Sequence, residues 1–215
     1  MENKEIVLIP AIRNPEQVAN KYCKILMLGA KNVGKTAIMN YHMHDILCHE
    51  NYRKPCNNTA TYSSVVMRDL KIEYVVLDEP AQQNYPKPSY FKMCYGYVIV
   101  YDITSMESWM RIKQLLIDID RWGPPKFNCK VIIGNKCDKD SERKVPYKQV
   151  FDFVKAREIP YIETSALTGQ NIVEAFGILM NDIAGEFVKL RSPESINLES
   201  GLIKLTNVVH VKKTR

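Results

Sequence analysis

The segment Gly29-Ala30-Lys31-Asn32-Val33-Gly34-Lys35-Thr36 constrains this chain more than any other feature. It follows the apolar run Tyr22 to Leu28 and opens an amphipathic run from Thr36 to Cys48, so we expect a strand, a glycine-rich turn and a helix. Glycines at its two ends let the backbone wrap around a phosphate chain, with N–H groups beside the positive end of the helix. The spacing therefore predicts a phosphate-binding loop.

Individual residue types in this loop predict separate contacts. Lys35 supplies a point charge for the outer phosphates, and the Thr36 hydroxyl is a ligand for Mg²⁺. Asp78 ends the apolar run Tyr74 to Leu77 and is the expected second anchor for the metal ion. The bland alternative is a glycine turn with an incidental lysine, which the flanking strand and helix disfavour. The loop residues that we expect to hold the ligand are Gly29, Asn32, Val33, Gly34, Lys35, Thr36 and Ala37.

Short β-rich runs alternate with helical patterns from residue 22 to about residue 189, which predicts a wound α/β sheet. Val65 to Met67 and Ile72 to Leu77 flank a charged corner, so we expect a hairpin that adds one antiparallel strand to an otherwise parallel sheet. Tyr97 to Tyr101 and Val131 to Ile133 are uniformly apolar, as strands covered on both faces are.

Three further helices are expected from capping and stop signals. Thr104 and Glu107 have capping-box spacing, and Gly123-Pro124-Pro125 ends the helix that they open. A helix from Pro146 through Ala156 follows. Asn171 with Glu174 opens a last helix, whose buried stripe is Ile172, Phe176, Leu179 and Ile183.

The composition is that of a soluble globular domain, because 46% of the 215 residues are hydrophobic and 25% are charged. We expect an N-terminal extension at residues 1–21, one domain at 22–190 and a C-terminal tail at 191–215. The net charge of +6 is spread along the chain, so nucleic acid is not an expected partner. Six cysteines without a CxxC pair or a secretory leader predict reduced thiols in a cytoplasmic protein.

A second motif, Asn135-Lys136-Cys137-Asp138, predicts a site for a purine base. The Asp138 carboxylate can accept both donors on the Watson–Crick edge of guanine, whereas adenine offers no such pair, so guanine would be selected. Asn135 is expected to tie this loop to the phosphate loop, and the aliphatic stem of Lys136 to cover one face of the base. The segment Thr164-Ser165-Ala166-Leu167 adds contacts from Ser165, Ala166 and Leu167.

These motifs, in this order, resemble the Ras superfamily of small GTPases, and Tyr97-Val98-Ile99-Val100-Tyr101-Asp102-Ile103-Thr104 with Glu163-Thr164-Ser165-Ala166 looks most like its Rab branch. The resemblance covers residues 22 to about 189. It implies a P-loop NTPase fold of three layers, the Ras-like G domain, with a six-stranded mixed sheet flanked by five helices. It also implies GTP, GDP and Mg²⁺ as cofactors, and effector and regulator proteins that bind through residues 50–62 and 78–93.

The first switch segment departs from the family pattern. Family members usually place a threonine after a proline there, and its hydroxyl binds Mg²⁺, but here Cys56 follows Pro55. A thiol is a poor ligand for a hard cation that prefers oxygen. We take Thr59 as the candidate replacement metal ligand, with Thr61 as the alternative.

The second switch segment is Asp78-Glu79-Pro80-Ala81-Gln82, where the family usually has Asp-Thr-Ala-Gly-Gln. Gln82 matches the glutamine that orients the attacking water, so it is the candidate catalytic residue. Ala81 replaces the pivot glycine, and Pro80 restricts the backbone, so the usual switch helix is not expected. We therefore expect intact nucleotide binding with slow hydrolysis; the alternative is a nucleotide-locked scaffold that binds partners through fixed switch loops.

Three further readings are weaker. A P-loop kinase for a small metabolite would leave the base motif unexplained. A zinc site at His44 and Cys48, with His42 nearby, lacks a second ligand pair. The last cysteine is Cys137 and Glu2 follows Met1, so no lipid anchor is expected, and membrane recruitment would need a partner or the weakly basic tail.

Overall fold

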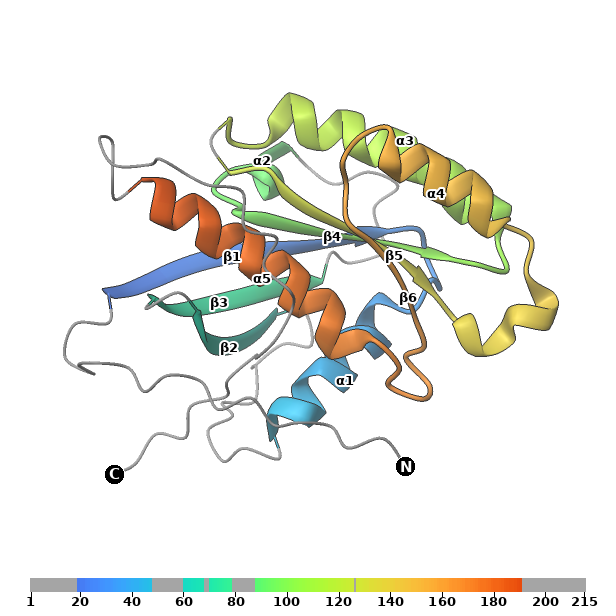
Figure 1. The fold of residues 1–215 in the computed structure, drawn as a ribbon, viewed down its shortest axis with the longest axis horizontal. Coiled ribbons are helices and arrows are strands. Elements are labelled where there is room, and N and C mark those ends of the chain that lie inside the picture. The colour runs from blue at the N-terminus through green and yellow to red at the C-terminus, as the bar shows by residue number, and fades with distance from the viewer. Residues whose placement is uncertain (1–18, 48–59, 68–69, 79–87, 126, 191–215) are drawn as a thin grey trace, which may run out of the picture.

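Six strands form one sheet in the order β2-β3-β1-β4-β5-β6 (Figure 1). The protein is described by a computed structural model, which covers residues 19–47, 60–67, 70–78, 88–125 and 127–190. In chain order the elements are β1 (Ala19–Gly29), α1 (Lys35–Leu47), β2 (Ala60–Met67), β3 (Leu70–Asp78), α2 (Pro88–Phe91), β4 (Gly96–Asp102), α3 (Met106–Trp122), β5 (Cys129–Asn135), the 3₁₀-helix η2 (Cys137–Glu142), α4 (Tyr147–Lys155), β6 (Tyr161–Thr164) and α5 (Ile172–Lys189).

The hairpin of β2 and β3 supplies the antiparallel edge, and every other neighbouring pair is parallel. This arrangement confirms the mixed sheet with one antiparallel strand. All seven residues of β4 are buried, as expected for a central strand with helices on both faces. The strands are longer than the apolar runs from which we predicted them, because backbone pairing continues through polar residues at their ends.

The helices cover the sheet in two layers (Figure 1). α1 and α5 pack on one face, where Ile38, Phe176 and Ile183 belong to the same apolar cluster as Met27 of β1. α2, α3 and α4 pack on the other face, around a cluster that includes the fully buried Trp109. The predicted stripe of α5 is buried throughout, the predicted three-layer fold is confirmed, and the described part of the chain contains the five expected α-helices.

The capping residue predicted for α3 is wrong, whereas Asn171 is the N-cap of α5 as predicted. Ser105, not Thr104, is the N-cap of α3, and its side chain accepts a hydrogen bond from Ser108 N. Thr104 instead donates to the Asp102 carboxylate. At α5, Asn171 occupies the N-cap position with a left-handed φ of 59° and makes no side-chain capping bond, because its amide donates to the Glu163 carbonyl oxygen.

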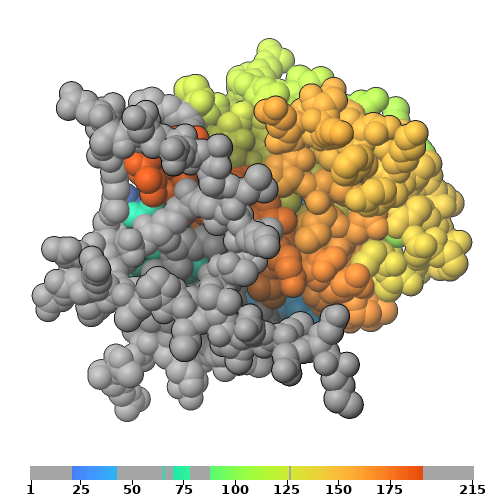
Figure 2. Space-filling model, in the orientation of Figure 1, coloured from blue at the N-terminus to red at the C-terminus, as the bar shows by residue number. Residues whose placement is uncertain are grey.

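Several expectations concern residues outside the described part of the chain. They include Thr59, Gln82 and the tail at 191–215, so the domain boundaries stay a prediction. In the described ranges, α2 is a single helical turn that begins at Pro88. Within those same ranges, none of the helices has the length and apolar character needed to cross a bilayer. Figure 2 shows that η2 and α4, in yellow to orange, form the right-hand surface of the face that is viewed in Figure 1.

Candidate nucleotide-binding site

Two glycines set the shape of the loop between β1 and α1. A Cβ on Gly29 would lie 2.3 Å from the Val100 carbonyl oxygen, and one on Gly34 would lie 2.2 Å from Asn135 Nδ2. Gly34 also has a φ of +99°, which a side chain rarely allows. The loop therefore approaches β4 and the Asn135 side chain more closely than any other residue type permits.

Lys35 is buried at the base of the loop, at the start of α1. Its Nζ atom donates to the carbonyl oxygens of Gly29 at 3.0 Å and Ala30 at 2.9 Å. The first turn of α1 contains no acidic residue, so its positive end is not neutralised from within the helix. An ammonium group, helix N–H groups and exposed Thr36 thus gather at one end of the sheet, an arrangement suited to a phosphate chain.

Asn135, the last residue of β5, connects three segments of the site. Its buried side chain donates to the Val33 carbonyl oxygen at 2.8 Å and accepts hydrogen bonds from Thr164 Oγ1 at 3.2 Å and Ala166 N at 3.1 Å. The predicted tie between the base loop and the phosphate loop is confirmed.

Asp138 lies exposed in η2 and is joined to the segment after β6. Ser165 Oγ donates to its Oδ1 atom at 2.5 Å, and the same hydroxyl accepts hydrogen bonds from Leu167 N and Thr168 N, each at 3.2 Å. The hydroxyl of Ser165 therefore fixes the carboxylate and the turn around Ala166 and Leu167 together. An exposed carboxylate held in this way is available to accept hydrogen bonds from a ligand.

A network of hydrogen bonds centred on Glu163 supports the base loop. Arg143 donates to both oxygens of the Glu163 carboxylate at 2.7 Å, and Tyr161 OH donates to Glu163 Oε1 at 2.6 Å. These bonds to Glu163 raise the pKa of the Arg143 guanidinium, and burial raises the pKa of Tyr161. The Arg143 guanidinium and the Tyr161 phenol, both bonded to Glu163, hold the segment after η2 against β6.

Lys136 makes a contact that the sequence analysis did not predict. Its Nζ atom lies 2.6 Å from Oδ2 of Asp102, the buried last residue of β4. Burial favours a higher pKa for Asp102, but hydrogen bonds from Lys136 and Thr104 outweigh it and leave the pKa below its usual value. The signal was available in the sequence, since Asp102 is a charged residue that ends a wholly apolar strand.

The structure describes some of the residues that were predicted to bind the metal ion. Asp78 ends β3, whose parallel pairing sets it opposite Met27, two residues before the phosphate loop. Hydroxyl and carboxylate oxygens from Thr36 and Asp78 suit Mg²⁺, with phosphate oxygens completing its preferred coordination. Thr59, Gln82 and the side chain of Asp78 lie outside what the structure describes.

The structure does not test the zinc site suggested at His44 and Cys48; among the side chains that it describes, no cluster of three or more His, Cys, Asp or Glu occurs. His42 is buried, stacks on Phe176 at 3.8 Å between ring centroids and hydrogen-bonds Tyr74 OH at 2.9 Å. It therefore packs in the core, while His44 and Cys48 fall outside the described side chains.

The fold, the glycine-lined loop and the base loop define a nucleotide-binding domain of the P-loop class. The sequence model of the Ras family matches residues 24–185. The chain is 36% identical over 162 residues to the Ras-related protein Rab-1C of Dictyostelium discoideum, covering 74% of this chain and 80% of that protein. It is 32% identical over 165 residues to the GTP-binding protein YPT1 of Saccharomyces cerevisiae, with 71% and 74% covered.

A third relative lies outside the Rab branch. The Ras-related protein Ral-a of Drosophila melanogaster is 30% identical over 183 residues, which cover 84% of this chain and 88% of that protein. The chain therefore belongs to the Ras family of small GTPases, on its Rab-like side.

Proposed function

We propose that this protein is a guanine-nucleotide-dependent regulator that binds GDP and GTP with Mg²⁺ and hydrolyses GTP slowly. The observation that carries the proposal is the Asn135 amide, which joins the phosphate loop at Val33 to the base loop and to Ala166. One side chain thus joins the phosphate loop to the segment in which Ser165 holds the exposed Asp138 carboxylate, so a nucleotide could contact both loops at once. The name of the yeast relative, a GTP-binding protein, supports the same ligand.

The proposed contacts follow from the positions of the side chains. Lys35 would exchange the Gly29 and Ala30 carbonyl oxygens for phosphate oxygens, while backbone N–H groups from Asn32 to Ala37 complete the cradle. Asp138, held by Ser165, would accept the two guanine donors, with backbone groups of Ala166 and Leu167 beside the base. Thr36, Asp78 and Thr59 are the proposed Mg²⁺ ligands.

The slow hydrolysis rests on residues of the switch segments. Gln82 is the proposed residue that orients water, but Pro80 and Ala81 restrict the backbone that must place it. The same substitutions favour the alternative function, a nucleotide-locked scaffold. In either case, effectors and regulators would bind through residues 50–62 and 78–93, and the protein would be cytoplasmic, reaching membranes through partners or its basic tail.

Mass spectrometry of the nucleotide that copurifies with the protein tests the binding step. We expect GDP or GTP, and we expect added GDP, but not ADP, to compete for the site at millimolar Mg²⁺. A protein that purifies empty and binds neither guanine nucleotide would refute the proposal. Preference for ATP over GTP would instead favour the hypothesis of a P-loop kinase for a small metabolite.

Single-turnover GTP hydrolysis separates the regulator from the scaffold. We expect a measurable rate, below that of an ordinary small GTPase assayed in parallel, that falls further in Gln82→Ala. A rate equal to that reference contradicts slow hydrolysis. No hydrolysis, together with equal amide exchange in the GDP and GTP forms, favours the scaffold.

A further inference from the structure

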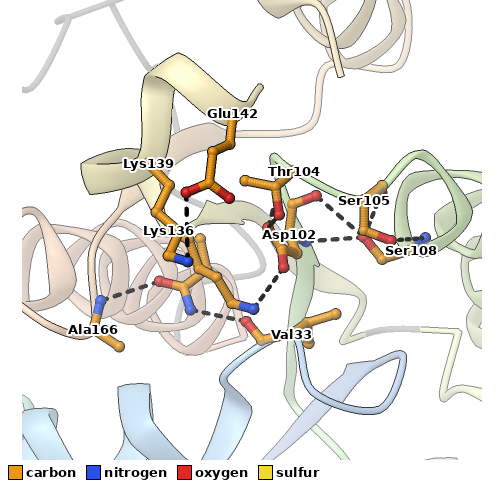
Figure 3. Close-up of polar contacts among 10 residues, drawn as sticks. Val33, Asp102, Thr104, Ser105, Ser108, Lys136, Lys139, Glu142 and Ala166 are labelled. Atoms are coloured by element: carbon orange, nitrogen blue, oxygen red, sulfur yellow. Dashed lines mark hydrogen bonds and ion pairs between the residues drawn. The ribbon is translucent and has the colours of Figure 1, made fainter. Parts of the chain in front are cut away.

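Asp102 places a buried carboxylate beneath the base loop, outside the four-residue motif that is expected to bind guanine. Both of its oxygens are used: Oδ1 accepts from Thr104 N at 2.8 Å and from Thr104 Oγ1 at 2.7 Å, and Oδ2 pairs with Lys136 Nζ at 2.6 Å. Figure 3 shows the Asp102 carboxylate between Thr104 and Lys136.

The backbone around Asp102 is fixed as well. Asp102 N donates to Ser108 Oγ at 3.0 Å, so the start of α3 holds the end of β4. Asp102 lies opposite Asn135 in the β4–β5 ladder, and the next residue, Ile103, donates from its N–H to the Asn135 carbonyl oxygen at 3.1 Å. The carboxylate therefore has a fixed position relative to the base loop.

Lys136 is held at both ends of its side chain. Its backbone adopts a left-handed φ of 68°, and its ammonium is bound to Asp102, so the four methylene groups between them have restricted freedom. A lysine side chain in water populates many rotamers and loses conformational entropy when it is ordered. Here the ion pair has ordered the stem before any ligand arrives.

We propose that Asp102 is a positioning residue, which orders the Lys136 stem against the purine face and thereby slows nucleotide dissociation. The inference rests on the proposed binding of guanine nucleotides. It also predicts selectivity: a stem packed on the ring face does not read the exocyclic amino group that distinguishes guanine from hypoxanthine. Asp102 should therefore slow the release of GDP and IDP alike.

Asp102→Asn tests the proposal, because asparagine keeps the shape and an acceptor for Thr104 but places a neutral amide beside the ammonium. We expect the dissociation rates of GDP and IDP both to rise about tenfold, equivalent to roughly 1.4 kcal/mol. The matched control is Asp120→Asn, which removes the acid of another lysine pair, 2.6 Å from Lys130, and should leave both rates unchanged.

A double-mutant cycle distinguishes positioning through Lys136 from a general structural effect. In the Lys136→Met background, Asp102→Asn should add less than about twofold, because the two residues act as one unit. A full tenfold effect in that background, a wild-type rate in Asp102→Asn alone, or a change confined to GDP would overturn the inference. If the wild-type protein itself binds no guanine nucleotide, the proposed function fails instead.

A measurement on the wild-type protein covers the case in which Asp102→Asn does not fold. An amine-reactive reagent should modify Lys136 more slowly than Lys139 in protein freed of nucleotide, because Lys139 is more exposed and its Glu142 partner lies 3.7 Å away. Addition of 1 M salt should still leave the labelling rate of Lys139 higher than that of Lys136. Equal labelling of the two lysines would show that the stem is not ordered in advance and would overturn the proposal.

Discussion

Asn135 links the segments of the site, because its amide is buried and all of its described side-chain bonds reach other segments. It contacts the phosphate loop at Val33 and the segment after β6 at Thr164 and Ala166. A buried backbone group that loses its partner costs about 1–3 kcal/mol. The amide therefore contributes to stability as well as to the spacing of the two loops.

We predict that Asn135→Ala lowers the free energy of unfolding by about 2–4 kcal/mol, because Val33 and Ala166 lose buried partners. Urea denaturation of the nucleotide-free protein measures the change. Asn128→Ala is the control, since Asn128 is exposed and bonds only to exposed Asp120 at 3.2 Å among the residues described, and it should shift stability by less than about 0.5 kcal/mol. Equal effects of the two changes would contradict this role.

Residue identities could be predicted where a motif dictates their chemistry, as for Asn135, and not where tertiary contact decides. A charged residue at the end of an apolar strand marked Asp102 as unusual, but its pairing with Lys136 could not be predicted, because that contact requires β4 and β5 to be neighbours in register, which no local pattern specifies. The same limit applies to Ser165, whose hydroxyl meets Asp138 across 27 positions of sequence.

At the scale of elements, the start of α3 is part of the site. Ser105 caps the helix. The hydroxyl of Ser108, in the first turn, accepts a hydrogen bond from the backbone N–H of Asp102. The sequence suggested Thr104 as the cap because threonine and Glu107 have the spacing of a capping box. The Thr104 hydroxyl instead donates a charge-assisted hydrogen bond to the Asp102 carboxylate, and Ser105 takes the N-cap position.

Ser105→Ala should lower the free energy of unfolding by about 1 kcal/mol, the usual loss when an N-cap serine is removed. Because Ser108 would then be less firmly placed, we also expect faster nucleotide release, by less than the effect of Asp102→Asn. Thermal or urea unfolding and a dissociation assay measure the two quantities. Ser141→Ala, at an exposed position in η2, serves as the comparison; a similar loss there would show that the cap is not responsible.

The order of the elements along the chain and the antiparallel hairpin were predictable, because apolar runs, helical spacing and the charged corner mark them in the sequence. The ends of elements were less predictable. β1 begins at Ala19, ahead of the apolar run that starts at Tyr22, because it pairs with β3 from Leu70 onward and pairing extends the strand. Similarly, Asn171 lies at the predicted start of α5 but its side chain makes no capping bond, since its amide donates to the Glu163 carbonyl oxygen.

At the scale of the whole molecule, burial makes three cysteines unreactive. Burial raises the pKa of Cys23 to about 12, of Cys94 to about 11 and of Cys129 to about 12. The thiolate is the reactive form, so at pH 8 all three groups are almost wholly neutral; Cys23 and Cys94 are buried as well, and Cys129 is half-buried. We expect iodoacetamide to leave them unmodified in the native protein and to label them in 6 M guanidinium, as read by peptide mass mapping. Rapid native labelling of Cys23 would show that the β1 core opens.

Nucleotide binding should stabilise the whole domain, because the ligand contacts segments that come together only in the folded chain. The proposed phosphate contacts come from the β1–α1 loop, and the proposed base contacts come from the ends of β5 and β6, so an unfolded chain would offer no equivalent site. A ligand at a hundred times its dissociation constant adds about 2.7 kcal/mol. We therefore expect GDP with Mg²⁺ to raise the Tm in proportion to the logarithm of its concentration, and EDTA to reverse part of that gain. ADP at the same concentrations is the control. If ADP raised the Tm as much as GDP does, the stabilisation would come from the phosphate cradle alone, and Asp138 would have no part in choosing the base.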